Sequence, residues 1–362
     1  VVFKYREPGS KLATKLFVQA SELCFAGICT PNNLKEQETA QQELSNLYSR
    51  IIGFMFTLNA SEIISTFQSQ LTTAVNSGNT SKAILLLNGM QYIQFSLQNN
   101  EEMNRVRSFI DFVLAIITKK TKGDINASCY RLVGNILIQL SDQEEQEGVD
   151  YTNFRQWVTE LYHSHKKPWK KLKDHVPALI MEVGILCNGN KELFAQQPFS
   201  MFERLGKLTK FNDKNRAIVL DCIFYLLFTL LTRYDRVKDS IDIGLILDKF
   251  ALEIFPTATS KKSVPPHMNT VTVLTDIASL ISIFHLEFAV RHFILASLQP
   301  SDYYERCFVG NRAFQELADR LAISFVVRKG VVENVRSLIY FNRRTAAVRK
   351  IREKTSFFLS DE

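Results

Sequence analysis

The histidines and cysteines are the side chains best suited to chemistry, because both bind metals and act as catalysts. His163 and His165 stand two residues apart and could supply two ligands of a zinc site. Such a site needs three or four ligands in tetrahedral geometry, and no cysteine or acid cluster lies close by. A hydrated loop beside a lysine run is the simpler interpretation. We interpret His285 and His292, seven residues apart, as core or interface histidines.

The six cysteines form no CxxC pair, and most lie among apolar neighbours, where cysteine behaves as a small hydrophobic residue. They are Cys24, Cys29, Cys129, Cys187, Cys222 and Cys307. We therefore expect reduced core residues of a cytosolic protein and no disulfide framework. The sequence also lacks the GxSxG, GxxxxGK[ST] and GxGxxG motifs. No catalytic residue, metal or cofactor is predicted, and an enzyme is disfavoured.

Two basic clusters could bind a partner. The first holds five lysines around Trp169, namely Lys166, Lys167, Lys170, Lys171 and Lys173. The second, residues 328–354, has nine basic and two acidic residues, with Tyr340 and Phe341 among them. Its net charge equals the +7 of the whole chain, so the remainder is neutral. Such clusters bind RNA, acidic protein surfaces or anionic lipid.

The two clusters differ in what they predict. We interpret the lysine run as a solvated face. The second cluster has six arginines, and arginine forms bidentate pairs with carboxylates. We therefore predict that it contacts an acidic protein partner, and that nucleic acid is the less favoured ligand. The residues chosen for this contact are Arg343, Arg344, Arg349 and Lys350.

We expect helices to position these residues. Proline breaks helices, and no proline occurs between Pro31 and Pro168. Three apolar stripes at intervals of three and four residues mark amphipathic helices. They are Val106, Phe109, Ile110, Val113, Leu114 and Ile117; Val273, Ile277, Leu280, Ile281 and Phe284; and Leu44, Leu47, Ile51, Phe54, Met55 and Leu58. Alternation of period two never persists for six residues, so almost no sheet is expected.

Polar stretches predict the ends of about fourteen helical segments. Breaks are expected at residues 59–62, at 76–79 with Thr80 or Ser81 as the cap, at 98–100 and at 122–124. The acidic Glu101-Glu102 pair should complement a helix dipole, while Glu144-Glu145 falls in a linker. Linkers are predicted at 142–150 and 165–174, and a longer loop at 256–268.

A succession of helices with short connections favours an all-α, HEAT/armadillo-like solenoid of stacked antiparallel helix pairs. Ile218 to Leu231 is apolar on all sides, which predicts an inner helix buried from both faces. No run of about 18 apolar residues occurs, so a membrane span is not expected. The chain of 362 residues begins without methionine, and we expect it to be a piece of a much larger protein.

One stretch resembles a known family. Glu305 to Asp319 fits the pattern ERxxxGxRAFxxxAD, which is similar to a signature of the Furry family of cell-morphogenesis scaffolds. Upstream, Leu286 to Ala289 resembles that family's Leu-Asp-Phe-Ala, and Phe255-Pro256 followed by Val264-Pro265 resembles its two proline pairs. Weaker similarity extends back to about residue 47. The signature residues are Glu305, Arg306, Gly310, Arg312, Ala313, Phe314, Ala318 and Asp319. We assign them helix packing and inter-repeat ion pairs.

The sequence also departs from the family pattern. Tyr304, Cys307 and Asn311 stand where the family has proline, methionine and leucine, and the proline-rich stretch after the signature is absent. We therefore expect a divergent member, with residues 1–327 as a Furry-like N-terminal helical region and 328–362 as a basic helical segment. The choice of partner is the property that these departures put most in question.

The resemblance implies a non-enzymatic scaffold in cell morphogenesis, polarised growth and neurite or cell-shape control. It implies NDR/LATS-type kinases and Mob coactivators as partners, and a place in the cytoplasm at the cell cortex or on microtubules. Two alternatives remain open from the residues alone. One is an importin- or adaptor-like transport protein, and the other is a nucleic-acid-binding helical repeat.

Overall fold

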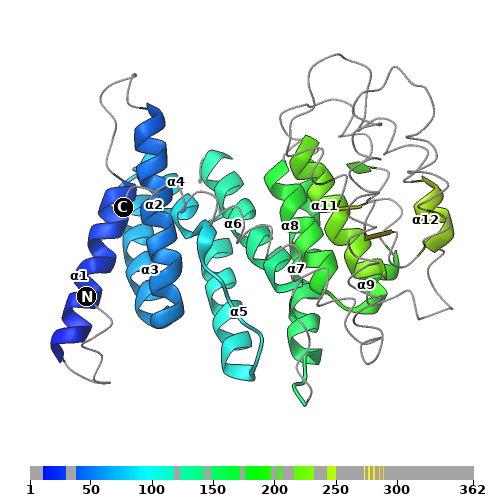
Figure 1. Ribbon diagram of the computed structural model, residues 1–362, viewed down its shortest axis with the longest axis horizontal. Helices are drawn as coiled ribbons and strands as arrows, with labels where there is room; N and C mark the ends of the chain where they lie inside the picture. The colour runs from blue at the N-terminus through cyan, green and yellow to red at the C-terminus, as the bar shows by residue number, and fades with distance from the viewer. Residues whose placement is uncertain are drawn as a thin grey trace, which may run out of the picture. The chain divides into compact units, whose positions relative to one another are not determined.

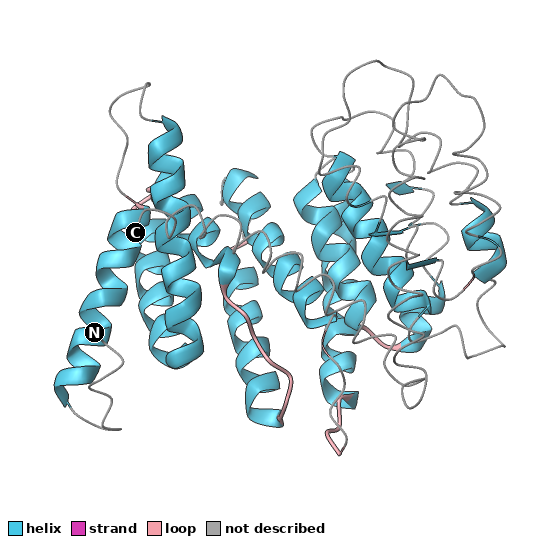
Figure 2. Ribbon diagram, in the orientation of Figure 1, coloured by secondary structure: helices cyan, strands magenta, loops and turns pink. Residues whose placement is uncertain are grey.

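The computed structural model describes residues 11–29, 38–117, 123–141, 143, 148–171, 176–196, 201, 204–205, 216–231 and 243–249, then 273, 276–277, 280–281, 285 and 288. Every regular element in these ranges is a helix, as Figure 2 shows. The chain divides into two compact units, Val1–Leu193 and Phe194–Glu362.

The first unit is a succession of helices that pack in consecutive pairs. These are α1 (Lys11–Ile28), α2 (Glu38–Leu58), α3 (Ala60–Asn76), α4 (Thr80–Gly89), the short 3-10 helix η3 (Met90–Tyr92), α5 (Asn100–Ala115), α6 (Gly123–Ser141), α7 (Thr152–Lys171) and α8 (Val176–Asn188). Helices α1 and α2, α3 and α4, α5 and α6, and α7 and α8 are in contact. Figure 1 shows them side by side.

A second set of contacts stacks these pairs on one another. Helix α2 contacts α4, α4 contacts α6, and α6 makes its most extensive contact with α8. The second helices of successive pairs thus form a continuous layer (Figure 1). Each helix of this layer buries apolar side chains against the next helix of the layer. This is the arrangement of a repeat array. The predicted all-α solenoid of stacked antiparallel helix pairs is confirmed.

Asparagine side chains start three of these helices. The Oδ1 atoms of Asn59, Asn79 and Asn99 accept hydrogen bonds from the backbone N–H groups three residues ahead, at 3.2, 3.0 and 2.9 Å. An amide oxygen at this position satisfies one of the free N–H groups of the first turn. The predicted breaks at 59–62 and 98–100 are confirmed. The expectation of Thr80 or Ser81 as a cap is wrong, because Asn79 fills that role.

A chain of phenylalanine rings ties the first three pairs together. The centroid of Phe67 in α3 lies 6.3 Å from that of Phe25 in α1 and 5.6 Å from that of Phe109 in α5. Phe109 also contacts Phe95 at 5.3 Å, and Phe95 contacts Phe56 of α2 at 4.9 Å. All five rings are buried. Edge and tilted ring pairs at these distances add attraction to the burial of apolar area.

Helices α6 and α8 cross so closely that their backbones touch. A Cβ atom on Gly134 would lie 2.5 Å from the backbone nitrogen of Met181, and one on Gly184 would lie 2.9 Å from the carbonyl oxygen of Gly134. Beside this crossing, the Nδ2 atom of buried Asn188 donates to the carbonyl oxygens of Leu137, at 2.6 Å, and Gly184, at 2.8 Å. The two glycines permit the approach, and Asn188 fixes its position along α6.

The connection between α4 and α5 is an extended segment with alternate residues buried. Ile93, Phe95 and Leu97 are buried, while Gln94 is exposed and Ser96 is half-buried. Gln143 holds this segment as a neighbouring strand would. Its Nε2 atom donates to the carbonyl oxygen of Phe95 at 2.6 Å, and its Oε1 atom accepts from the N–H of Leu97 at 3.0 Å. Gln143, in the predicted 142–150 linker, therefore holds the segment between α4 and α5 in place.

The prediction of a basic linker over residues 165–174 is wrong for most of its length. Helix α7 continues to Lys171 and passes through Pro168. Pro168 has no N–H to donate to the carbonyl of Ser164, which normally costs helix stability. Upstream residues hold the helix in place, since Trp157, Val158 and Leu161 on one side are buried. The side chains of the lysine run lie outside the described residues.

The second unit buries its most apolar helix, as predicted. In α11 (Arg216–Thr229) the side chains of Val219, Leu220, Ile223, Phe224 and Leu227 are all buried, Asp221 and Tyr225 are half-buried, and Ile218 is exposed, which departs from the predicted burial on all sides. Ile277, Leu280 and Ile281 of the predicted second stripe are also buried. The helix α12 (Ile243–Lys249) buries Ile246 and Leu247. Among the helices of the described ranges, none combines the length and apolarity that a bilayer crossing requires.

Candidate interaction surfaces

The residues that the sequence singled out as sites fall outside the part of the chain that the structure describes. This holds for the whole signature from Glu305 to Asp319 and for Arg343, Arg344, Arg349 and Lys350. Their assigned roles stay predictions. His163 is exposed on α7 and contacts the neighbouring ring of Tyr162 at 5.8 Å. Within the described ranges, no three His, Cys, Asp or Glu side chains gather as metal ligands would.

The cysteines that the structure describes are free thiols, and four of these five are buried. Burial raises the pKa of the Cys129 thiol to about 12. The thiolate is the reactive form of cysteine, so this side chain is unreactive near neutral pH. Burial also raises the pKa of the half-buried Cys29, and the nearby Lys82 opposes that rise.

These environments predict different reactivities for the two thiols. With iodoacetamide at mildly alkaline pH, we expect Cys29 of the native chain to be alkylated well before Cys129. Cys129 should react only after denaturant exposes it, because its thiol keeps its proton below a pH of about 12. Peptide mass spectrometry over a time course measures both rates in one sample. Equal rates for the two cysteines in the native chain would contradict the burial of Cys129.

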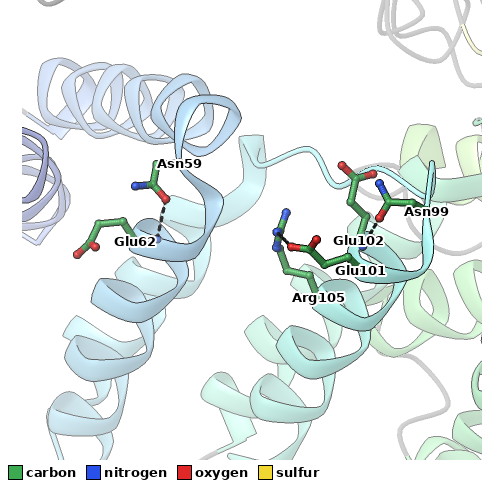
Figure 3. A network of polar contacts seen from close by, with 6 residues as sticks. All are labelled: Asn59, Glu62, Asn99, Glu101, Glu102 and Arg105. Carbon is green, nitrogen blue, oxygen red and sulfur yellow. Dashed lines mark hydrogen bonds and ion pairs between the residues drawn. The ribbon is translucent and has the colours of Figure 1, made fainter. Parts of the chain in front are cut away.

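The acidic pair Glu101-Glu102 lies at the start of α5, where it was predicted to complement the helix dipole (Figure 3). The backbone N–H of Glu102 donates to the Asn99 side chain, and its carboxylate accepts from the N–H of Gln98 at 3.3 Å. Glu101 forms an ion pair with Arg105 at 2.9 Å. Every one of these contacts serves the first turn of the helix, so the pair has a structural role there.

A polar cluster joins α5 to α7. The indole Nε1 of Trp157 donates to Oδ1 of Asp111 at 3.2 Å, and Arg107 lies 3.7 Å from the other carboxylate oxygen. The Arg107 guanidinium also stands 6.0 Å from the centre of the indole ring. Trp157 is 5% exposed, whereas Arg107 and Asp111 are about half exposed. The tryptophan is thus an anchor between two helix pairs, with charged groups on its rim.

The outer face of α1 and α2 carries large apolar side chains that the first unit does not cover. Leu44, Leu47, Ile51 and Phe54 form one stripe on α2, and Leu16 and Leu23 stand seven residues apart on α1. Their exposed fractions run from 37% to 70%. This stripe predicted the α2 helix, but the spacing of its residues did not indicate that their side chains would be exposed. A patch of this kind marks an interaction site.

The described surface is therefore suited to binding proteins. It combines a buried, tightly connected interior with exposed helix faces, one of them apolar. Repeat arrays present extended surfaces of this kind to partners.

The comparison with known protein families identifies the family of this chain. No curated protein and no solved structure matches it. Residues 8–325 match the cell morphogenesis N-terminal family. The matched range includes the signature from Glu305 to Asp319 and all the helices that the structure describes. The chain therefore belongs to the cell morphogenesis N-terminal family and is a Furry-like N-terminal region.

Proposed function

We propose that this chain is a non-enzymatic scaffold that brings an NDR/LATS-type kinase together with its Mob coactivator during polarised growth. The observation that carries the proposal is the family match over residues 8–325, because it gives the chain a role in cell morphogenesis. The stacked helix pairs support it, since an array of this kind offers separate surfaces to two proteins. Two partners held on one chain meet at a raised effective concentration.

The proposal places the scaffold in the cytoplasm, at the cell cortex or on microtubules, where cell shape is controlled. It assigns the partner contact to the arginine-rich segment 328–354. The net charge of this segment is +7, which equals the net charge of the whole chain. Arginine binds carboxylates in a planar, bidentate geometry, so an acidic surface on the kinase or on Mob is the ligand that the segment fits.

Charge reversal tests this assignment. In a pull-down with purified kinase and Mob, we expect the variant carrying Arg343→Glu, Arg344→Glu, Arg349→Glu and Lys350→Glu to lose most of its binding. The matched control reverses four lysines of the other basic cluster, at Lys166, Lys167, Lys170 and Lys171, which we interpret as solvated. That control should bind as the unchanged chain does, since solvated charges contribute little to affinity.

Other outcomes would redirect the function. Equal retention of both partners by the two variants would remove the assignment to the arginine-rich segment. Binding of RNA with a steep salt dependence, in place of the kinase, would favour a nucleic-acid-binding repeat. Binding of a small GTPase or a sorting peptide would favour a transport protein.

A further inference from the structure

The proposed function does not use the apolar face of α1 and α2. Six of the eight large apolar side chains that are exposed among the described residues belong to it, namely Leu16, Leu23, Leu44, Leu47, Ile51 and Phe54. Single exposed apolar residues are normal on a protein. Six on two neighbouring helices are not, and such a patch marks an interface. The comparable stripe on α5, from Val106 to Leu114, is buried within the stack.

The six side chains form one continuous face because α1 and α2 are in register. Gly27 of α1 packs against the ring of Tyr48 of α2, so these two positions lie at the same level of the antiparallel pair. Leu23 stands one turn before Gly27, which brings it level with the turn of α2 that holds Ile51. Leu16 lies two turns further back, beside the end of α2 at Leu58. Residues three or four apart share a helix face.

The spacing along α2 is that of a helix seam. Leu44, Leu47, Ile51 and Phe54 follow each other at intervals of three, four and three residues, and half-buried Leu58 continues the series after four more. This is the a/d repeat of helices that pack knobs into holes. Leu16 and Leu23 repeat the seven-residue step on α1. The face is therefore shaped to receive helices that run along it.

The charges on the rim indicate which helices these are. Exposed Glu22 directly precedes Leu23 on α1, and exposed Arg50 directly precedes Ile51 on α2. They have opposite sign and, by the same register, lie within about one helical turn of each other along the pair, on the two outer edges of the face. A face with this pattern is complementary to itself. The Arg50 guanidinium is already positioned 5.6 Å from the centre of the Tyr92 ring.

We propose that two copies of this chain associate through the outer face of α1 and α2. A two-fold axis parallel to the helices lays α1 of one copy, antiparallel, on α2 of the other. Leu23 then meets the partner's Ile51, and Leu16 meets the partner's Leu58. Glu22 stands beside the partner's Arg50, and the symmetry repeats this ion pair on the opposite edge. Such an isologous interface is the commonest way in which identical chains pair.

Sedimentation equilibrium of the whole chain tests the proposal. We expect a reversible monomer–dimer equilibrium, and Ile51→Glu should weaken dimerisation at least ~30-fold, because it places a charge at the centre of the apolar contact. Ile218→Glu is the matched control, since Ile218 is an exposed isoleucine of α11. It should leave the dimer unchanged. Both substituted residues are exposed, and a thermal melt checks that each variant keeps its fold.

Charge exchange separates a second copy from any other partner. Glu22→Arg and Arg50→Glu should each weaken the dimer about three- to tenfold, and the double variant E22R/R50E should restore it, because both ion pairs reform with reversed sign. A chain that stays monomeric up to about 100 μM would overturn the proposal. A dimer indifferent to Ile51→Glu, or a double variant as weak as the single ones, would overturn it equally.

Discussion

Phe67→Ala is expected to be the most destabilising single substitution in the first unit. Phe67 is fully buried and touches Phe25, Phe109 and Phe112 from the neighbouring helix pairs. Replacing a buried phenylalanine by alanine removes its transfer free energy and leaves a cavity, at a cost of about 3–5 kcal/mol. We expect the melting temperature of the first unit to fall by roughly 10 °C.

Urea unfolding followed by tryptophan fluorescence measures this loss, because Trp157 is buried in the same unit. Phe54→Ala, measured at a chain concentration low enough to keep the chain monomeric, is the matched control, because Phe54 also lies in the proposed dimer contact. It makes the same chemical change at a half-exposed position of α2. Its free energy of unfolding should stay within about 0.5 kcal/mol of the unchanged chain. Equal losses in the two variants would show that the ring of Phe67 does not connect the helix pairs.

Gly134→Ala is expected to have the second-largest effect, and its sign is opposite to the one that helix propensity predicts. Alanine favours a helix over glycine by about 1 kcal/mol. At Gly134, however, the new Cβ atom would lie 2.5 Å from the nitrogen of Met181 and 2.7 Å from the carbonyl carbon of Ile180. These are backbone atoms, so α8 must move away from α6. Overpacking of this kind costs about 1–3 kcal/mol, and we expect a net loss of roughly 2 kcal/mol.

The control for this substitution lies in the same helix. Gly123 begins α6, and a Cβ atom there would meet no atom within 4 Å. Gly123→Ala should therefore be neutral or slightly stabilising. Comparing the urea midpoints of the two variants isolates the contact between α6 and α8. Two variants of equal stability would mean that the helices do not cross as closely as their backbones indicate.

The spacing of apolar residues predicted most of the fold, because most helices bury one apolar stripe. The stripe on α5 predicted its helix and its buried face, and the apolar run of α11 predicted burial from both sides. The stripe on α2 predicted a helix equally well, yet four of its side chains are exposed. A 3–4 spacing reports that a face is apolar. It does not report whether the chain itself supplies the helix that covers that face.

Contacts between residues distant in sequence were the part that could not be predicted. Gln143 stood in an acidic stretch and was assigned to a linker, since nothing nearby indicates that it pairs with Phe95 and Leu97. The backbone contact at Gly134 and Gly184 depends likewise on two helices meeting in space. The extension of α7 beyond His165 was missed because Pro168 and the lysines suggested a break.

The candidate site was predictable only through resemblance. The signature from Glu305 to Asp319 led to the family, which the match over residues 8–325 confirms. Its residues have no chemistry of their own that names a partner. The apolar face of α1 and α2 was found only with the structure, because exposure is a property of the assembled stack.

The extended segment from Ile93 to Leu97 limits how the family can vary in length at this point. Connections between helices usually accept insertions. Here one added residue would turn Gln94 and Ser96 inward and bring buried side chains to the surface, since neighbouring positions of an extended chain point to opposite sides. It would also move the two backbone groups that Gln143 binds. We expect relatives to keep the number of residues between α4 and α5 while their sequence changes.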